Sequence, residues 1–367
     1  MALSRRLALA APLTWAARGH AEDVPSLKQA AAARGLLFGG APETSLAAAP
    51  GAYRGLIAAH CALLAPILPW TAARRPGEYA WGEEAVAALE FAETHGMRLT
   101  GSHLLWHEWM PDWFTALTDR AAAGQAMREH ITWLVTRFAG RAHAWNVVNE
   151  AIRPEDGGSG GLRATPLLAR LGPEYIEAAF IAARQADPRA KLLYNDYNME
   201  AATPAHEARR GALLRLLDRL LAKGVPIDGV GLQSHLHPDE AFDARRYRRF
   251  LGDIAARGLT VAITELDVLE TRVKGTIAAR DQAVADVYAR FLAAALDEPA
   301  VSAVVLWGLA DPYSWQNAWR NEPSRAHFRR SDGTPARPLP FDLEFHPKPA
   351  FHAVLRALEH APDRGPG

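Results

Sequence analysis

Short apolar runs alternate with longer segments of helical periodicity from residue 35 to the end of the chain. The runs are continuously apolar, which is typical of parallel strands that are covered on both faces. This pattern predicts strands at residues 35–40, 63–68, 98–106, 144–150, 191–198, 229–235, 260–267 and 303–308. It predicts helices after them at about residues 53–60, 83–95, 122–138, 174–186, 205–223, 244–257, 278–296 and 351–360. Pro66 lies inside the second run and cannot donate a ladder hydrogen bond, so we expect that strand to be short or bulged.

Eight strand–helix units in series favour an α/β fold of the (β/α)8 type, a TIM barrel, over an open doubly wound sheet. The chain has 367 residues, which a barrel of ordinary size with its loops would use in full. No linker, low-complexity tract or change of composition divides it. We therefore expect a single domain over residues 30–362.

The N-terminus has the pattern of a targeting segment. Arg5-Arg6 precedes a short apolar run at residues 7–11, and small residues continue to Gly19-His20-Ala21. A basic start, an apolar stretch and a small-x-Ala ending predict a bacterial signal peptide over residues 1–21, possibly of the twin-arginine type. The alternative is an alanine-rich disordered tail. Export would place the mature protein in the periplasm or outside the cell, without a membrane segment.

Composition excludes several classes of protein. Lys+Arg and Asp+Glu both number 41, so the net charge is zero and gives no support for binding nucleic acid or anionic lipid. Cys61 is the one cysteine, which rules out an intramolecular disulfide and a cysteine-based zinc site. The 11 tryptophans are many, and several follow predicted strands, where flat aromatic faces suit sugar rings.

Polar residues collect where the predicted strands end. In a barrel these ends emerge on one face, which holds the functional site. Nearly every strand from the third onward contributes such a residue. Polar residues that occur by chance at the start of a loop would not be found at so many strand ends. The set is His107, Asn149, Glu150, Asn195, Gln233, His235, Glu265, Asp267 and Trp307.

Two of the apolar strands, the fourth and the seventh, end on glutamate, as a two-carboxylate glycosidase requires. Strands four and seven lie on opposite sides of a barrel mouth, so Glu150 and Glu265 can face each other across a sugar. His235 ends the adjacent sixth strand and could donate one N–H each to Glu265 and Asp267, which would favour the charged form of Glu265, as a nucleophile requires. Glu150 has only Asn149 beside it, and a less polar setting would raise its pKa, as a proton donor requires.

A metal site is the alternative use of these side chains. His103, His107 and His235 match no metal-binding spacing. Too few oxygen ligands cluster around Glu150 or Glu265 for calcium. We therefore expect no metal and no cofactor.

The motifs together resemble glycoside hydrolase family 10, whose typical activity is endo-1,4-β-xylanase. Residues 145–151 (Trp-Asn-Val-Val-Asn-Glu-Ala) resemble its acid/base motif, and residues 263–267 (Ile-Thr-Glu-Leu-Asp) its nucleophile motif. Further similarity lies at residues 105–107, 194–198, 229–235, 306–308 and 348–350, and the resemblance covers roughly residues 35–358.

The resemblance implies a retaining mechanism on a β-glycan substrate, by a monomer without cofactor. It implies that Glu150 is the acid/base, that Glu265 is the nucleophile and that His235 bridges Glu265 and Asp267. Asn149 and Gln233 would bind the 2-hydroxyl of the sugar beside the cleaved bond. The resemblance also implies that Trp307 and Trp315 form walls around that sugar and that Trp106 and His107 lie beneath it. Tyr197 would lie on the leaving-group side.

The sequence departs from the family on the side of the cleft that holds the non-reducing sugars. The family usually carries Glu-Asn-x-x-Lys before a tryptophan after the second strand. When the chain is aligned on Trp70, those positions are Ala65, Pro66 and Pro69. Each hydrogen bond lost to a sugar hydroxyl would cost about 0.5–1.5 kcal/mol. Several such losses would weaken binding of ordinary xylan by orders of magnitude unless other residues compensate.

Two further departures lie in the third and fourth strands. The family's Gly-His-Thr is replaced by Gly101-Ser102-His103, and the aspartate before the paired valines is replaced by Asn146. His103, Glu108 and the pair Arg74-Arg75 are candidates for compensation, although a solvated surface role is the expected one for the arginines.

Two alternatives to a xylanase therefore stay open. One is a retaining β-glycosidase that acts on a decorated or non-xylose glycan. The other is a carbohydrate-binding protein without turnover. The presence of both Glu150 and Glu265 argues against the second, since a pure binding protein needs neither.

Overall fold

The computed structural model describes residues 25–75, 77–79, 82–318 and 328–365. The predicted signal peptide, residues 1–21, lies outside the described residues. Within the described part of the chain, no helix is both long enough and apolar enough to cross a membrane.

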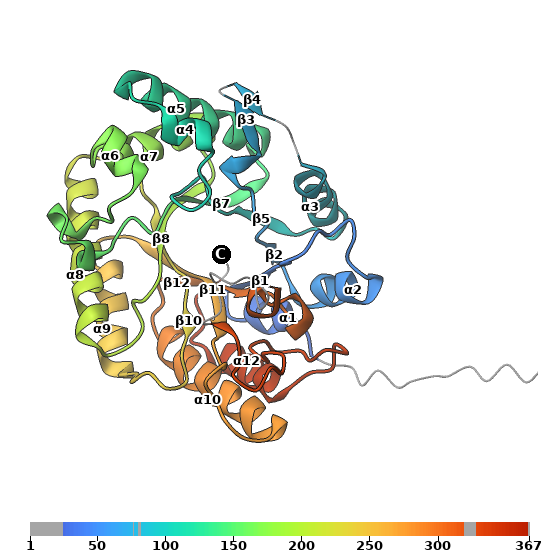
Figure 1. Cartoon of the computed structure of the whole chain (residues 1–367). Helices are drawn as coiled ribbons and strands as arrows, with labels where there is room; N and C mark the ends of the chain where they lie inside the picture. The colour runs from blue at the N-terminus through green and yellow to red at the C-terminus, as the bar shows by residue number, and fades with distance from the viewer. Residues whose placement is uncertain (1–24, 76, 80–81, 319–327, 366–367) are drawn as a thin grey trace, which may run out of the picture.

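A closed ring of parallel strands forms the centre of the molecule (Figure 1). The ring runs β1-β2-β5-β7-β8-β9-β11-β12, and the pairing of β12 with β1 closes it. Its strands are β1 (Leu37–Ala41), β2 (Leu63–Leu64), β5 (Arg98–Gly101), β7 (Ala142–Asn149), β8 (Lys191–Asp196), β9 (Gly229–Leu232), β11 (Thr260–Val268) and β12 (Val301–Trp307). The predicted single-domain (β/α)8 barrel is therefore confirmed.

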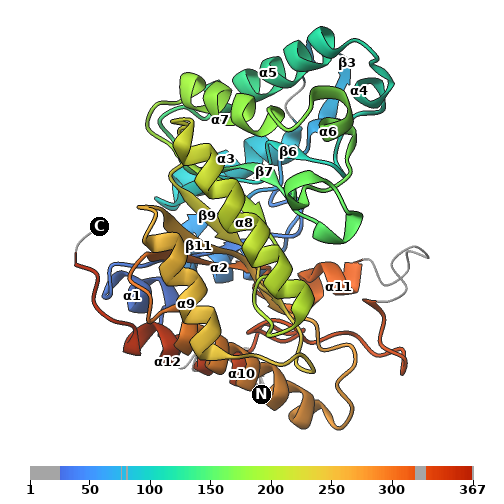
Figure 2. The same ribbon diagram turned by 90° about the vertical axis from the view of Figure 1, so that its left-hand side faces the viewer.

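Helices surround the ring, and those following β8 and β9 lie side by side on its outer face (Figure 2). The main helices are α2 (Gly51–His60), α3 (Glu83–Thr94), α5 (Arg120–Arg137), α7 (Tyr175–Ala186), α8 (Pro204–Ala222), α9 (Ala244–Ala255), α10 (Ile277–Ala295) and α12 (Pro349–His360). The shorter ones, which the sequence pattern missed, are α1 (Leu27–Ala32), α4 (Asp112–Ala116), α6 (Pro166–Leu171) and α11 (Trp315–Ala318). Side-chain oxygens of Asp119, Thr203, Asp243 and Thr276 accept backbone N–H groups at the starts of α5, α8, α9 and α10, as N-caps do.

Two strands that the sequence predicts as continuous are divided in the structure. The third splits into β5 and β6 (Leu105–Trp106), and the sixth splits into β9 and β10 (His235–Leu236). Both second pieces pair with a neighbouring strand nearer the barrel mouth, β6 with β7 and β10 with β11. Between the pieces the chain steps out of register: Ser234 has φ of +62°, and Leu104 N donates to Asn146 O. The second strand is short, as Pro66 predicted.

Two apolar layers hold the barrel together. The outer one packs the sheet against the helices, and at Gly101 it leaves no room for a side chain, because a Cβ would lie 2.0 Å from the Trp145 ring. The inner layer fills the barrel with small and branched side chains and includes Ala65, Ala144, Val305, Trp307 and Trp315. The inner layer therefore forms the floor of any site at the barrel mouth.

Candidate active site

A cleft of about 730 Å³ opens at the carboxyl ends of the strands. Nine residues with a predicted catalytic or sugar-binding role line it: Trp106, Asn149, Glu150, Tyr197, Gln233, His235, Glu265, Trp307 and Trp315. They come from seven strands, β6 to β12, or the loops that follow them, and ring closure brings them together. The cleft combines two buried carboxyl groups with several aromatic faces, the composition that binding of a sugar chain requires.

Glu265, on β11, lies in a fixed set of polar contacts. Asn195 Nδ2 donates to its Oε1 at 2.8 Å, and His235 Nε2 lies 3.3 Å from its Oε2. Burial would raise the pKa of Glu265, but the hydrogen bond from His235, the charge of nearby histidines and the Asn195 contact together lower it. The side chain is therefore held as a carboxylate.

His235 carries the positive charge of this cluster. Its Nδ1 lies 2.8 Å from Asp267 Oδ1, and Trp315 Nε1 donates to the other oxygen of Asp267 at 2.6 Å. Burial would lower the pKa of His235, but Asp267 and Glu265 raise it well above its usual value. The imidazolium can therefore donate one N–H to each carboxylate, the arrangement expected from the sequence. Asp267 is fully buried behind the cleft.

Glu150, directly after β7, has the opposite electrostatic setting. Its Oε1 accepts hydrogen bonds from Asn149 Nδ2 at 3.1 Å and Gln233 Nε2 at 3.0 Å. Burial is the largest influence and raises the pKa of Glu150 to about 7, and the negative charge of Asp196 acts in the same direction. The hydrogen bond from Gln233 and the charge of Arg163 oppose this rise. Glu150 therefore holds its proton near neutral pH, whereas Glu265 does not.

A chain of amide side chains links the two glutamates. Asn195 Nδ2 donates both to Glu265 Oε1 and to Asn149 Oδ1, at 2.8 and 2.9 Å. Gln233 Nε2 contacts Asn149 Oδ1 and Glu150 Oε1. Thr264 Oγ1 donates to Asn195 Oδ1 at 2.7 Å and so fixes that amide's orientation. The two carboxyl groups thus share one rigid polar wall.

His107 lies outside the cleft lining, as do Asn195 and Asp267 among the residues named from the sequence. It packs edge-on against Trp106 with ring centroids 6.1 Å apart. Burial, followed by the charge of Arg163, lowers the pKa of His107 to about 4. The neutral ring supports Trp106 from behind, and Trp109, which does line the cleft, packs edge-on against Trp106 at 4.5 Å.

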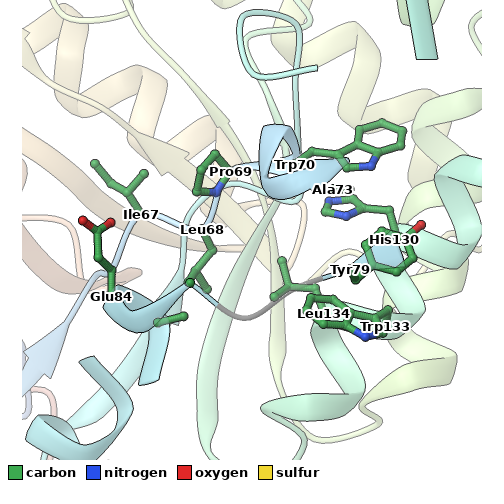
Figure 3. A pocket seen from close by; sticks show the side chains of 12 residues that line it. Ile67, Leu68, Pro69, Trp70, Ala73, Tyr79, Glu84, His130, Trp133 and Leu134 are labelled. Atoms are coloured by element: carbon green, nitrogen blue, oxygen red, sulfur yellow. The ribbon is translucent and has the colours of Figure 1, made fainter. Parts of the chain in front are cut away.

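The loop after β2 shows what replaces the family's usual polar set. It forms a separate apolar pocket of about 130 Å³ together with the hairpin β3 (Ala73–Arg75) and β4 (Glu78–Tyr79), α3 and α5 (Figure 3). Trp70 stacks on His130 at 4.5 Å between ring centroids. Residues 65–70 are absent from the cleft lining. On this side of the barrel mouth, apolar side chains therefore pack together where the family usually has charged and polar side chains.

The two polar replacements in the third strand have different positions. Ser102 is buried and accepts a hydrogen bond from Asn146 Nδ2 at 3.3 Å, so these two departures contact each other inside the barrel. His103 lines the cleft, and its Nε2 lies 3.6 Å from Glu265 Oε1. Glu108 also lines the cleft, whereas Arg75 is exposed and pairs with Glu78 at 3.7 Å. The side chain of Arg74 lies outside the described part of the structure.

Three ionisable residues near the glutamates were missed by sequence reasoning. Arg163 contacts Glu150, Asp196 raises the pKa of Glu150, and Glu43 follows β1. Burial, together with Glu265 and Asp267, raises the pKa of Glu43 to about 8. Glu43 could have been found, because it is a polar residue that follows the first strand. Nothing in the glycine-rich loop before Arg163 indicated that Arg163 lies close to Glu150.

Within the described ranges, one trio of side chains lies close enough to hold a metal ion: Asp342, Glu344 and His346. Glu344 and His346 are exposed, and none of the three lines the cleft. Such acidic surface groups are common without an ion, so the trio carries no assignment.

Comparison with known proteins gives consistent matches along the chain. Residues 26–357 match the family model described as Glycosyl hydrolase family 10. Endo-1,4-beta-xylanase B of Thermotoga neapolitana is 34% identical over 278 residues, which cover 76% of this chain and 74% of that protein. Endo-1,4-beta-xylanase 3 of Hypocrea jecorina is 30% identical over 283 residues, covering 77% of this chain and 70% of that protein.

Solved structures match equally well. Native xylanase 10B from Thermotoga maritima superposes with a TM-score of 0.79 at 31% identity, covering 91% of this chain and 98% of that one. Xylanase 10B from Thermotoga petrophila RKU-1, solved in complex with xylobiose, superposes with a TM-score of 0.79 at 30% identity. This match covers 91% of this chain and 97% of that one. The barrel fold and these matches together define the class of this protein as a glycoside hydrolase. The chain belongs to glycosyl hydrolase family 10.

Proposed function

We propose that this glycoside hydrolase is an exported, monomeric, retaining endo-1,4-β-xylanase, with Glu150 as acid/base and Glu265 as nucleophile. The observation that carries the proposal is the pair of buried glutamates with opposite pKa shifts on one amide-linked wall. The relatives named endo-1,4-beta-xylanase and the xylobiose complex of a similar barrel support xylan as the substrate. Export rests on the basic and apolar pattern of residues 1–21.

In the first step, the Glu265 carboxylate attacks the anomeric carbon from one face of the sugar. The glycosidic C–O bond breaks, and Glu150 transfers its proton to the leaving oxygen, so the leaving chain departs with a free hydroxyl. A glycosyl ester to Glu265 remains, and Glu150 is now a carboxylate. His235 and Asn195 hold Glu265 in the charged form that this attack requires.

In the second step, Glu150 acts as base and takes a proton from water. The water oxygen attacks the anomeric carbon, the ester bond breaks, and the Glu265 carboxylate is restored. Two inversions at one carbon give net retention of configuration. Each glutamate returns to its starting protonation state, so the reaction needs no further reactant.

The remaining cleft residues receive binding roles in this proposal. Asn149 and Gln233 bind the 2-hydroxyl of the sugar beside the cleaved bond, since their amides already line the path between the glutamates. Trp307 and Trp315 wall that sugar, Trp106 supports it from below, and Tyr197 stacks on the leaving-group side. His103 is the candidate for contacts on the opposite side, where the family's usual set is replaced.

The alternative that the structure favours most is a retaining β-glycosidase on a decorated or non-xylose glycan. The apolar pocket formed by the loop after β2 supplies the reason, because it replaces charged contacts to non-reducing sugars. A carbohydrate-binding protein without turnover has no use for one ionised and one protonated glutamate.

An assay of the purified protein on a substrate panel tests the proposal. We expect reducing ends to be released from xylan in a mixture of chain lengths, and product of retained configuration in the first minutes by NMR. Activity on arabinoxylan or another β-glycan alone would exclude the simple xylanase, and no release from any β-glycan would exclude the enzyme. Size-exclusion chromatography and fractionation of cells producing the whole chain test the monomer and its export.

The two pKa shifts predict how the reaction depends on pH. On xylo-oligosaccharides, kcat/KM should fall as pH rises through about 7, because Glu150 loses the proton that the leaving oxygen needs. On the acid side, kcat/KM should fall only below about pH 4.5, the usual pKa of a glutamate, because the lowered pKa of Glu265 keeps this carboxylate ionised. An aryl glycoside whose leaving group needs no proton is the control and should lose most of the basic limb. A profile that stays flat through pH 9 on the oligosaccharide would contradict the role of Glu150.

A further inference from the structure

Arg163 is a buried arginine whose guanidinium contacts the residue proposed as acid/base. It follows the loop after β7, which contains the short helical turns η2 (Pro154–Asp156) and η3 (Ser159–Gly161). The loop folds back on the strand end, because Arg163 N donates to Ala151 O at 2.8 Å. The side chain is 6% exposed, so its charge must be compensated by nearby acceptors.

The guanidinium makes three contacts in the cleft wall. Its Nε donates to the backbone oxygen of Glu150 at 2.6 Å, and its Nη2 lies 3.7 Å from Glu150 Oε2. Nη2 also donates to the phenol oxygen of Tyr197 at 2.9 Å. One rigid cation therefore holds the backbone of Glu150, faces its carboxyl group and fixes the ring of Tyr197.

We propose that Arg163 is a positioning residue that holds the Glu150 carboxyl group poised between its acid and base forms and links it to Tyr197, on the leaving-group side of the cleft. The proposal rests on the function proposed above and deepens it. Arg163 makes no contact with the bond that is cleaved and acts through Glu150.

The physical reason lies in the two tasks of Glu150, which must be protonated in the first step and ionised in the second. Burial and the carboxylate of Asp196, on β8, both favour the protonated form. Arg163 opposes them, and so does the hydrogen bond from Gln233. When Glu150 gives up its proton, the guanidinium 3.7 Å away stabilises the carboxylate that forms.

Other charged groups around this wall are arranged so that Arg163 is the cation facing Glu150. His107, behind Trp106, has a pKa lowered to about 4 and is neutral near pH 7. Arg209 lies over the Tyr197 ring at 4.7 Å and pairs with Glu155 at 3.2 Å. Arg153 pairs with Asp156 at 3.2 Å and is about half exposed. His235 faces Glu265 and Asp267.

The link to Tyr197 gives the cation a second use. Its phenol accepts from Arg163, and Arg163 and Arg209 both lie near its ring, at 5.5 and 4.7 Å from the centroid. A sugar that stacks on Tyr197 therefore contacts a ring whose position depends on Arg163. Loss of Arg163 should weaken binding on the leaving-group side as well as change the ionisation of Glu150.

Arg163→Met tests the proposal through the pH profile of kcat/KM on xylo-oligosaccharides. The basic limb should move upward by about one pH unit, because Glu150 without the cation keeps its proton to higher pH. Arg163→Lys keeps the charge, and its basic limb should return toward that of the wild type. Arg153→Met is the matched control: it removes one positive charge from the same loop without a contact to Glu150, and its limb should not move.

Circular dichroism and thermal unfolding confirm that each variant is folded, and Arg163→Gln replaces the methionine variant if that one is not. A basic limb that stays in place in a folded neutral variant would overturn the role of Arg163 alone, and so would an equal shift in Arg153→Met. Wild-type protein without activity on any β-glycan would overturn the proposed function and this inference together.

Discussion

Replacing Glu265 with glutamine should lower kcat on xylan by roughly 10⁴- to 10⁶-fold, as loss of the nucleophile does in other covalent mechanisms. The amide keeps the shape of the side chain, and its oxygen can still accept from Asn195 or His235, so folding should persist. It cannot form the glycosyl ester, and no other carboxyl group replaces it, since Asp267 is fully buried behind the cleft. Initial rates on xylan, with thermal unfolding to confirm the fold, measure the effect.

A labelling experiment makes this result specific to one residue. A 2-fluoro xyloside with a good leaving group should trap the glycosyl ester, and peptide mapping should find the label on Glu265. Glu344→Gln, at an exposed position, is the control and should retain wild-type activity. Label on another residue, or more than about 1% residual activity in Glu265→Gln, would contradict the assignment.

The second large effect is expected for Glu150→Ala. General acid–base catalysis contributes typically about 10²- to 10⁴-fold, so turnover of xylan should fall by that range. An aryl glycoside with an activated leaving group needs no proton and should still form the glycosyl ester, which then accumulates. A burst of phenol followed by slow turnover is the expected kinetic signature.

Azide distinguishes the two glutamates by the configuration of the product. In Glu150→Ala it should attack the glycosyl ester and give the β-glycosyl azide. In Glu265→Ala it should attack the substrate directly and give the α-glycosyl azide. NMR of the products reads the anomeric configuration, and the same anomer from both variants would contradict the proposed division of roles.

The barrel could be predicted because its strands are buried on both faces. Strands buried in this way are continuously apolar, and a continuous apolar run is visible in the local sequence. Element boundaries were less predictable. The runs at residues 98–106 and 229–235 gave no sign of the steps at Ser102–Leu104 and Gln233–Ser234, because those steps are set by pairing with β7 and β11. The N-terminal helix α1 was missed because it precedes the first apolar run.

The candidate site was partly predictable for a related reason. A glutamate at the end of an apolar strand is a local feature, so Glu150 and Glu265 stood out, and ring closure then placed them in one cleft. Contacts to them were not local. Arg163 reaches Glu150 only because a glycine-rich loop folds back on the strand end, and His103 reaches toward Glu265 from the opposite side of the ring.

The sequence by itself therefore determined the strand order, the two glutamates and the family's motifs, since each depends on residues close together in the chain. The sequence also predicted the direction of the two pKa shifts, but only the tertiary structure supplied the burial and the full set of charges that cause them. The pKa values of the glutamates depend on burial and on charges from distant segments, such as Asp196, Arg163 and His235. The tertiary structure also decided that the loop after β2 packs into an apolar pocket away from the cleft, a property of packing that no local pattern contains.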